Sequence, residues 1–346
     1  MRGGGGNLLD LIHEAGQDGG AEPGRRRRKT ERPMNKSSAL LTIGELSELT
    51  GRPPIQIHGA LSGNDPADGS ALARKIRPRF VREFLNQKGI DYSFRVLAHM
   101  NLRGGVGKTV STISLAMRAS QFGFHTAVLD LDPQGSSSLA FDRIPEDEDP
   151  IFYDIWQNAS EMTKGSLKEI QEGLYILPSS LDNSLLDSVL VNPSLQKNTV
   201  KKVCDELEKI GFDLVVIDCP PSLTGAVVST VCASDVIVIP VSSDAFSFKG
   251  LQLTLNEISS ICRTFGIREP SVKILYTRYD RREKISEDAL LRLQGNYPDY
   301  LIPSVIRTSS DFSKTLEKRE TVFSTNRKGK AREDYDRYTR HVLGLP

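Results

Sequence analysis

The chain has 346 residues, of which 38% are hydrophobic and 26% charged, and its formal net charge is +1. This composition supplies enough apolar material for a sizeable core, and it excludes disordered, collagen-like and coiled-coil proteins. The length favours one large domain with a smaller one, or two domains, and the near-zero net charge alone gives no indication of a nucleic-acid partner. No apolar run reaches the roughly 18 residues of a membrane-spanning helix. The four cysteines lack metal-ligand spacing, so we interpret them as reduced thiols in or near the core.

Residues 1–36 are of low complexity, with glycine-rich stretches and the basic run Arg25–Lys29. Because they contain no periodic apolar face, we predict a disordered basic leader. The arginine run either contacts nucleic acid through its charge or is a solvated tail.

Residues 37–92 have the pattern of a small helical module. Apolar residues recur at helical spacing at Ile43, Leu46 and Leu49, between a candidate N-cap, Thr42, and a candidate stop, Gly51. After a loop rich in Gly, Asn, Asp and Pro comes a second amphipathic stretch with a basic face that includes Arg82. The segment TIGELSELTGRP resembles the first helix and turn of MerR-type helix-turn-helix domains. We therefore interpret the module as a DNA-binding element or as a dimerisation or docking element.

From residue 93 to residue 346, apolar β-rich runs alternate with amphipathic helical segments. Strands are expected at 94–100, 126–131, 174–177, 214–217, 236–241 and 272–276. This alternation predicts an α/β fold with a mostly parallel, twisted sheet and helices on both faces.

A glycine-rich segment between the first strand and the first helix of this region carries the clearest chemistry. Residues 101–110 read NLRGGVGKTV. A strand, a glycine loop and a helix in this order form a P-loop, whose backbone N–H groups and helix N-terminus hold phosphate oxygens. Lys108 is then expected to reach the β- and γ-phosphates, and Thr109 to place its hydroxyl on Mg²⁺. The strict pattern requires glycine where this chain has Leu102, so the loop is a deviant form.

The loop RGGVGKT resembles that of the ParA/MinD superfamily of deviant-Walker P-loop ATPases. It is closest to the ParA-type partition ATPases of the larger kind, which carry an N-terminal helix-turn-helix-like extension. The resemblance implies a P-loop NTPase domain over residues 93–346 that binds ATP and Mg²⁺. The nucleotide-binding residues that it implies are Arg103, Gly104, Gly105, Val106, Gly107, Lys108, Thr109 and Val110.

Two aspartate motifs extend the resemblance. Residues 129–135, LDLDPQG, are similar to the family's DxDPQG motif, which implies that Asp132 orients the attacking water and that Asp130 lies near Mg²⁺. Residues 212–221, FDLVVIDCPP, resemble a Walker B strand followed by the family's DxPP, which implies that Asp218 binds Mg²⁺ through water. Weaker similarities at 240–250, 302–307 and 328–335 bring the resemblance to about residues 95–345.

Two positions of the P-loop depart from the family pattern. Arg103 replaces the signature lysine that reaches across the nucleotide-bound dimer, and because arginine is always charged and can bind phosphate bidentately, we expect Arg103 to act in trans. With Lys108 and Asp132 it completes the predicted catalytic set. Val110 replaces a threonine that contacts the α-phosphate, which predicts weaker nucleotide binding by about 1 kcal/mol.

Basic residues are concentrated late in the chain. Residues 263–284 contain seven basic and three acidic side chains, and residues 314–332 contain seven basic and two acidic ones. The resemblance implies non-specific DNA binding through phosphate contacts, which are independent of sequence and depend on salt. The candidates are Arg281, Arg282, Arg307, Lys314 and Lys318. The alternative interpretation is that these are ordinary solvated helix faces.

As a whole, the resemblance implies a cytoplasmic, nucleoid-associated ATPase for DNA partition. It implies a homodimer on ATP binding, non-specific DNA binding, a ParB-like partner that stimulates slow hydrolysis, and operator binding by the helical module. The alternatives are a ParA-like ATPase that positions a protein cargo, a MinD-like ATPase at a membrane surface, and an iron–sulfur reductase. The short tail RYTRHVLGLP favours no stable membrane association, and the spacing of Cys219 and Cys232 does not favour a cluster. The five histidines are assigned no catalytic role.

Overall fold

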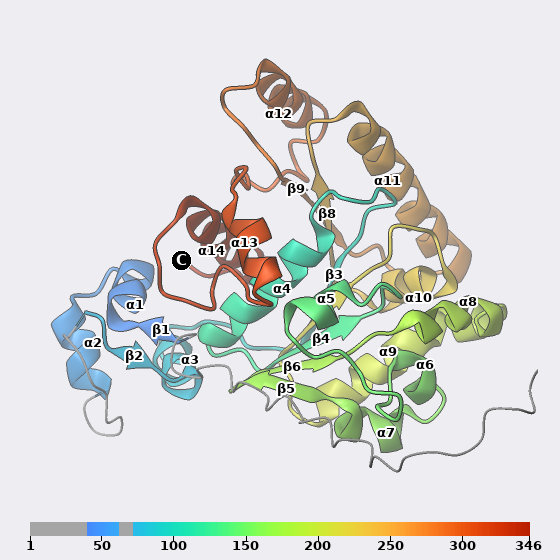
Figure 1. Ribbon diagram of the computed structural model, residues 1–346, viewed down its shortest axis with the longest axis horizontal. Coiled ribbons are helices and arrows are strands. Elements are labelled where there is room, and N and C mark those ends of the chain that lie inside the picture. The colour runs from blue at the N-terminus through green and yellow to red at the C-terminus, as the bar shows by residue number, and fades with distance from the viewer. Residues whose placement is uncertain (1–39, 62–71) are drawn as a thin grey trace, which may run out of the picture. The chain divides into compact units, whose positions relative to one another are not determined.

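The structure, a computed structural model, describes residues 40–61 and 72–346 (Figure 1). The predicted leader and the loop at 62–70 lie outside the described residues. The described residues belong to one compact unit, which contains a two-stranded and a seven-stranded sheet. We call the part from β3 to α14 the α/β body and the part from β1 to α3 the helical module. The division of the chain into leader, module and ATPase domain stays a prediction.

The seven-stranded sheet organises the α/β body. Its order is β5 (Lys168–Gln171), β6 (Leu174–Leu177), β4 (Thr126–Asp130), β7 (Leu214–Asp218), β3 (Arg95–His99), β8 (Val236–Val241) and β9 (Ser271–Tyr276). All neighbours are parallel except β5 and β6, which are antiparallel. The predicted mostly parallel α/β sheet is therefore confirmed. The chain leaves β3 toward β4 on one side, while β8 lies on the other, and ligands of open α/β sheets bind beyond the strand ends at such a point.

Helices cover both faces of this sheet (Figure 1). They are α4 (Lys108–Gln121), α5 (Ser136–Ala140), α6 (Phe152–Ile155), α7 (Ala159–Ser166), α8 (Leu186–Val189), α9 (Pro193–Lys209), α10 (Gly225–Ala233), α11 (Ala245–Phe265), α12 (Lys284–Asn296), α13 (Asp311–Glu317) and α14 (Lys330–Leu343), with a 3₁₀ turn at Leu181–Leu185. In β3, Val96 and Ala98 pack in a core with α9, α10 and α11. The alternate residue His99 bonds to Thr112 of α4 on the other face. Strand residues alternate between faces, so α4 and α14 lie opposite α9–α11.

The helical module consists of β1 (Leu41–Thr42), α1 (Ile43–Thr50), α2 (Pro54–Leu61), β2 (Lys75–Ile76) and α3 (Pro78–Asn86), with β1 and β2 antiparallel. The predicted cap is confirmed, because the Thr42 side chain accepts a hydrogen bond from the Glu45 backbone. The predicted stop is confirmed as well, because Gly51 adopts a left-handed conformation with φ of 66°.

Two features differ from the sequence-based expectations. The antiparallel edge strand β5 was not predicted, because its sequence KEIQ is short and mostly polar. The basic face of the second amphipathic stretch is not wholly available to a ligand, since Arg82 of α3 binds Asp213 of the α/β body through both guanidinium nitrogens. Within residues 40–61 and 72–346, every helix is too short or too polar to cross a membrane. All four cysteines lie in this part as free thiols.

Candidate nucleotide-binding site

The loop between β3 and α4 has the backbone of a phosphate-binding loop. Gly105 and Gly107 have φ of 76° and 96°, a region that side chains other than hydrogen disfavour. Gly107 is also the N-cap of α4, and no side chain caps that end among the described residues. The first N–H groups of α4 therefore face the position where a phosphate would lie, and the helix dipole favours an anion there.

Neighbouring elements hold this loop in place. The Asn101 side chain donates to the carbonyl of Pro240 at 2.7 Å and accepts from the Arg103 N–H at 2.9 Å. The Leu102 N–H donates to the Thr254 hydroxyl of α11 at 3.2 Å. On the β9 side, the Thr277 hydroxyl donates to the carbonyl of Val106 at 2.8 Å. The loop conformation is thus fixed from β8, α11 and β9 together.

Thr254, Thr277 and Gly250 were missed by sequence reasoning. A Cβ on Gly250 would lie 3.0 Å from both Arg103 Cβ and Asn101 Oδ1, so only glycine lets α11 approach the loop this closely. Gly250 does close the 240–250 segment that resembles the family, but the two threonines carry no motif. Their contact with the loop depends on the tertiary fold.

Lys108 is buried at the start of α4 and turns back over the loop. Its Nζ donates to the carbonyls of Asn101 at 3.1 Å and Arg103 at 3.0 Å. Burial lowers the pKa of Lys108, and the charge of Asp218 opposes this shift. The ammonium group thus satisfies the loop's own carbonyls in this arrangement.

Two buried carboxylates lie at the ends of adjacent strands, Asp130 of β4 and Asp218 of β7, which are register partners. One oxygen of Asp130 accepts from the Ser138 N–H at 2.8 Å and from its hydroxyl at 2.7 Å, and one oxygen of Asp218 accepts from the Ser137 hydroxyl at 2.8 Å. Burial raises the pKa of both carboxyl groups, and the charge of Asp218 raises that of Asp130 further.

The second oxygen of each carboxylate is buried without a hydrogen-bond partner in the described part of the chain. Buried polar atoms are almost always satisfied, so these two oxygens indicate a missing ligand such as a cation or water. Among residues 40–61 and 72–346 there is no cluster of three His, Cys, Asp or Glu side chains that could enclose a metal alone. The donor set therefore fits Mg²⁺, which usually combines one or two carboxylates with waters and phosphates.

The remaining predicted site residues lie around this centre. Thr109 lies beside Asp218 and lowers the pKa of that carboxyl against the effect of burial. Asp132 is half-buried just beyond β4, where its side chain accepts from the Gln134 N–H at 3.0 Å. Val110 is half-buried in the first turn of α4, whereas Arg103 is exposed on the loop. The structure thus brings together Lys108, Thr109, Asp130 and Asp218, with Arg103 at the surface.

The structure separates the five predicted DNA contacts. Arg281 and Arg282 are exposed in the loop before α12, and Arg282 forks onto Asp280 with Nε–Oδ1 and Nη2–Oδ2 distances of 2.9 and 2.6 Å. Arg307 is half-buried and bonds to the fully buried Asp334, with an Nη2–Oδ1 distance of 2.6 Å.

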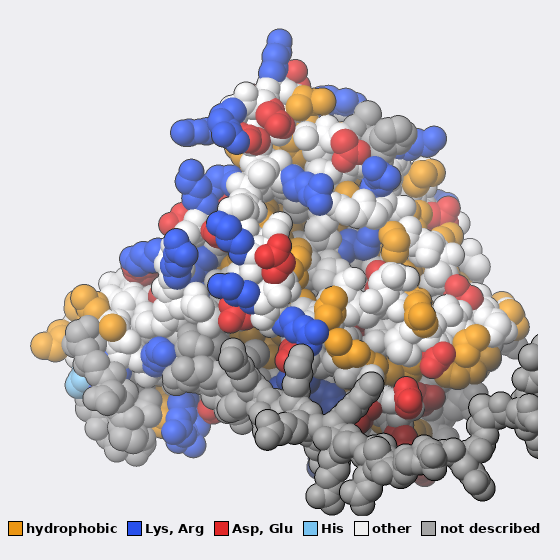
Figure 2. All heavy atoms as spheres, viewed as in Figure 1, with side chains coloured by type: hydrophobic (Ala, Val, Ile, Leu, Met, Phe, Trp, Pro, Cys, Tyr) orange, Lys and Arg blue, Asp and Glu red, His pale blue; other side chains and the backbone are white. Residues whose placement is uncertain are grey.

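Lys314 of α13 and Lys318, the residue that follows this helix, are by contrast exposed and line one cavity of about 400 Å³. Arg327 and Lys328 line the same cavity. Figure 2 shows Lys and Arg side chains over the surface formed by α12, α13 and α14. Lys314 and Lys318 are therefore the two candidates that share one basic surface.

Comparison with known proteins assigns the region that contains this loop to a family. The family described as an AAA domain matches residues 94–274, which is just over half of the chain. The chain belongs to the ParA/MinD superfamily. The superfamily suggested by the deviant loop and the two aspartate motifs is thereby confirmed.

Individual relatives of this ParA/MinD protein agree. It is similar to the cell division protein PomZ of Myxococcus xanthus, with 26% identity over 244 residues, 70% of this chain and 76% of PomZ. It is also similar to the chromosome partitioning protein ParA of Caulobacter vibrioides, with 27% identity over 213 residues, 61% of this chain and 80% of ParA.

Two solved structures share the fold. Nucleotide-free McdA of Cyanothece has a TM-score of 0.66 and 20% identity, over 72% of this chain and 100% of McdA. Cobyrinic acid a,c-diamide synthase of Mycobacterium smegmatis, with a bound ATP analogue and magnesium, has a TM-score of 0.60 and 25% identity, over 72% of this chain and 94% of the synthase.

Proposed function

We propose that this chain is a ParA-type partition ATPase of the bacterial cytoplasm that associates with the nucleoid. It binds ATP with Mg²⁺, forms a homodimer across the nucleotide, holds DNA in that state and releases it when a ParB-like partner stimulates slow hydrolysis. The observation that carries the proposal is the pair of buried carboxylates, Asp130 and Asp218, whose unpartnered oxygens lie at the strand ends beside the loop. The similarity to ParA and PomZ supports the partition role.

Each residue of the site has a defined task in this proposal. The loop N–H groups and the α4 N-terminus bind the phosphates, and Lys108 leaves the loop carbonyls to neutralise the β- and γ-phosphates. Thr109, Asp130 and Asp218 would hold Mg²⁺, which when bound offsets the charge that develops on the transferred phosphoryl group. Asp132 orients the attacking water, and Arg103 of one subunit contacts the phosphates bound by the other.

Nucleotide titration with Mg²⁺ and phosphate release test the enzymatic part. Lys108→Ala is expected to abolish ATP binding, because the loop loses its buried cation, and Asp218→Asn to bind ATP but to lose hydrolysis. Lys88→Ala, which removes an exposed lysine of the same charge, serves as control. Wild-type protein that neither binds nor hydrolyses ATP would contradict the proposal.

DNA binding is tested with a duplex of arbitrary sequence at two salt concentrations, with and without ATP. Each lost phosphate contact lowers the slope of log K against log salt by about 0.9. The double variant Lys314→Ala/Lys318→Ala is therefore expected to lower it by about 2. The control Lys201→Ala/Lys209→Ala removes two exposed lysines from α9. An unchanged slope in the first variant would place the DNA surface elsewhere.

In the same proposal, the helical module makes a second, sequence-specific contact with DNA at an operator. Its helix–turn–helix has Gly51 at the turn, and α2 exposes Gln56 while its Ile57 is buried. Arg74 beside β2 bonds the His58 ring at 2.8 Å. Footprinting of the DNA upstream of the gene, with Gln56→Ala as the variant, tests operator binding.

Two alternatives remain as outcomes of these experiments. ATP-dependent binding to a protein assembly without DNA binding would favour a ParA-like ATPase with a protein cargo. Sedimentation with anionic liposomes in the presence of ATP would favour a MinD-like activity.

A further inference from the structure

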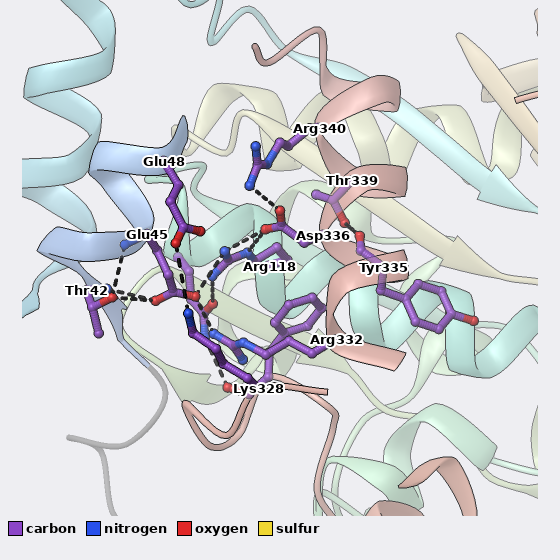
Figure 3. Close-up of polar contacts among 12 residues, drawn as sticks. Thr42, Glu45, Glu48, Arg118, Lys328, Arg332, Tyr335, Asp336, Thr339 and Arg340 are labelled. Atoms are coloured by element: carbon purple, nitrogen blue, oxygen red, sulfur yellow. Dashed lines mark hydrogen bonds and ion pairs between the residues drawn. The ribbon is translucent and has the colours of Figure 1, made fainter. Parts of the chain in front are cut away.

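One carboxylate on the helical module binds two arginines of the α/β body (Figure 3). Glu45 Oε1 accepts from Arg332 Nη2 at 2.6 Å and lies 3.1 Å from Arg118 Nη2. Its other oxygen, Oε2, accepts from the Thr42 N–H at 2.9 Å and from its hydroxyl at 3.0 Å. The same side chain therefore caps α1 and attaches α1 to the body. We call Glu45, Arg118, Arg332 and Asp336 the α1 junction.

Both arginines also donate hydrogen bonds to partners within the α/β body. Arg118, whose side chain is only 3% exposed, donates through Nε to Asp336 at 2.6 Å and through Nη1 to Gln121 at 2.8 Å. Arg332 donates to the carbonyl of Thr325 at 2.9 Å. Because each guanidinium is fixed by several partners, Glu45 binds two rigidly held donors, unlike a flexible surface ion pair.

Glu45 supplies negative charge that balances the two buried arginines of the junction. Burial raises the pKa of Glu45, but the charges and hydrogen bonds of Arg118 and Arg332 outweigh it and hold that pKa at about 2. Glu45 is thus ionised at any physiological pH. Without its charge, the carboxylate that remains in the junction is Asp336, which pairs with Arg118 and Arg340, and a buried cation would lack compensation.

The two arginines are connected to the nucleotide-binding loop through α4 and α14. Arg118 lies on α4, the helix that begins with Lys108 and Thr109. Helix α14, which carries Arg332 and Asp336, is bonded to the first half of α4. Tyr335 and Ser111 hydroxyls are 3.1 Å apart, and the His99 ring bridges the Thr112 hydroxyl at 3.0 Å and the Tyr338 hydroxyl at 2.6 Å. A shift of α4 at its N-terminus therefore moves the arginines that donate to Glu45.

The state of the loop indicates the direction of the effect. With the junction closed, Lys108 bonds to the carbonyls of Asn101 and Arg103, which it must leave in order to contact a phosphate. The closed junction and this loop arrangement occur together, and α4 connects them. If the junction holds α4 in this arrangement, it opposes nucleotide binding, and nucleotide binding loosens the junction by the same factor.

We propose that the α1 junction couples the helical module to the P-loop, so that the docked module restrains α4 and ATP binding loosens the hold on α1. This inference rests on the proposed nucleotide function of the site, and it adds a regulatory role for the module. It requires no change in which residues contact the nucleotide.

The first test is the Kd for a fluorescent ATP analogue with Mg²⁺ in wild-type protein and in Glu45→Gln. Glutamine keeps an oxygen that can accept from Thr42, but it loses the charge that holds the arginines. Coupling between sites usually changes affinity by 5-fold or more, so the Kd of Glu45→Gln is expected to fall by about fivefold. The matched control is Glu48→Gln, which removes the same charge from the same helix. Glu48 is 67% exposed and lies 4.0 Å from Lys328, so its ion pair is long and solvent-exposed and contributes little. Its Kd is expected to stay within about twofold of wild type.

The second test uses only wild-type protein and so does not depend on how a variant folds. Hydrogen exchange of residues 41–50 is measured with and without saturating ATP analogue. The amides of α1 are expected to exchange faster when nucleotide is bound. Exchange of β9, residues 271–276, serves as an internal reference.

The outcomes separate the coupling from the function on which it rests. If wild-type protein binds no nucleotide, the proposed function fails and the coupling with it. If wild-type protein binds nucleotide but Glu45→Gln has the same or a higher Kd, the coupling is wrong while the function stands. Exchange in α1 that does not change with nucleotide would likewise contradict the coupling and leave the function standing.

Discussion

The contact between α3 and the turn after α4 allows a sharp test of how the helical module is seated. A Cβ built on Gly123 would lie 2.6 Å from Arg82 Cβ and 2.7 Å from the Arg82 backbone nitrogen. Real Cβ atoms do not come this close to other heavy atoms, so Gly123→Ala must move α3, α4 or both. Gly123 also has φ of 89°, which alanine disfavours.

Gly211 provides a matched control for the backbone strain. Its φ is 93°, nearly that of Gly123, but no described atom lies within 4 Å of the position of its Cβ. The left-handed conformation costs a residue with a side chain about 1–2 kcal/mol, and overpacking adds about 1–3 kcal/mol. Gly211→Ala should therefore lose about 1–2 kcal/mol of unfolding free energy, and Gly123→Ala about 2–5 kcal/mol. The difference of about 1–3 kcal/mol measures the contact with α3.

Urea denaturation followed by circular dichroism measures both variants against wild type. Adding Arg82→Ala should not relieve the penalty at Gly123, since the clashing atoms are the backbone and Cβ that alanine keeps. Equal destabilisation by Gly123→Ala and Gly211→Ala would refute the reasoning, because α3 could then not be packed against the turn after α4.

Three further predictions concern the site. Burial raises the pKa of Asp218 above its ordinary 3.8, so the folded state favours the protonated carboxyl and the free energy of unfolding falls as the pH rises through that pKa. Asp218→Asn carries no charge there, so its free energy of unfolding should be about 2 kcal/mol higher than that of wild type at pH 8. Burial lowers the pKa of His99 from 6.5 to about 3, so wild-type protein should lose about 2–3 kcal/mol of unfolding free energy between pH 6.5 and about 4.5, and His99→Gln should lack this loss in the same titration. Arg103→Ala should bind ATP but fail to dimerise with it in analytical ultracentrifugation, and ATP-dependent dimers of normal stability would contradict the role of Arg103 in trans.

The fold and the centre of the site could be predicted because their signals are local. A strand, a glycine loop and a helix are adjacent in sequence, so residues 94–110 alone indicate a phosphate site. Asp218 was found because it ends a recognisable apolar strand, whereas the role of Asp130 followed from the resemblance of its segment to the family's DxDPQG motif. The threonines that hold the loop, Thr254 and Thr277, could not be found, since their role depends on which strands become neighbours.

The same reasoning explains why the α1 junction was not anticipated. In sequence, Thr42 and Glu45 form an ordinary capping box, which accounts for Glu45 without any further partner. The Oε1 atom of Glu45 binds Arg332, 287 residues away, and a contact of that separation leaves no periodic pattern in the sequence. Arg118 and Arg332 are each one of the chain's 45 lysines and arginines, and neither belongs to a motif. A local rule that is already satisfied can thus conceal a second, tertiary role of the same side chain.

The geometry of α4 also determines how the junction can act. Lys108 and Arg118 are ten residues apart, which at 1.5 Å per residue is about 15 Å along the helix. That exceeds the Debye length of about 8 Å at physiological salt, so the part of an electrostatic effect of Glu45 that acts through solvent would be strongly screened. Removing a negative charge would favour an anionic ligand by itself, and Glu48→Gln controls for this because it removes an equal charge nearby. If the gain in affinity of Glu45→Gln over Glu48→Gln is the same at low and high salt, it arises from displacement of α4, whereas a gain that disappears at high salt would be electrostatic.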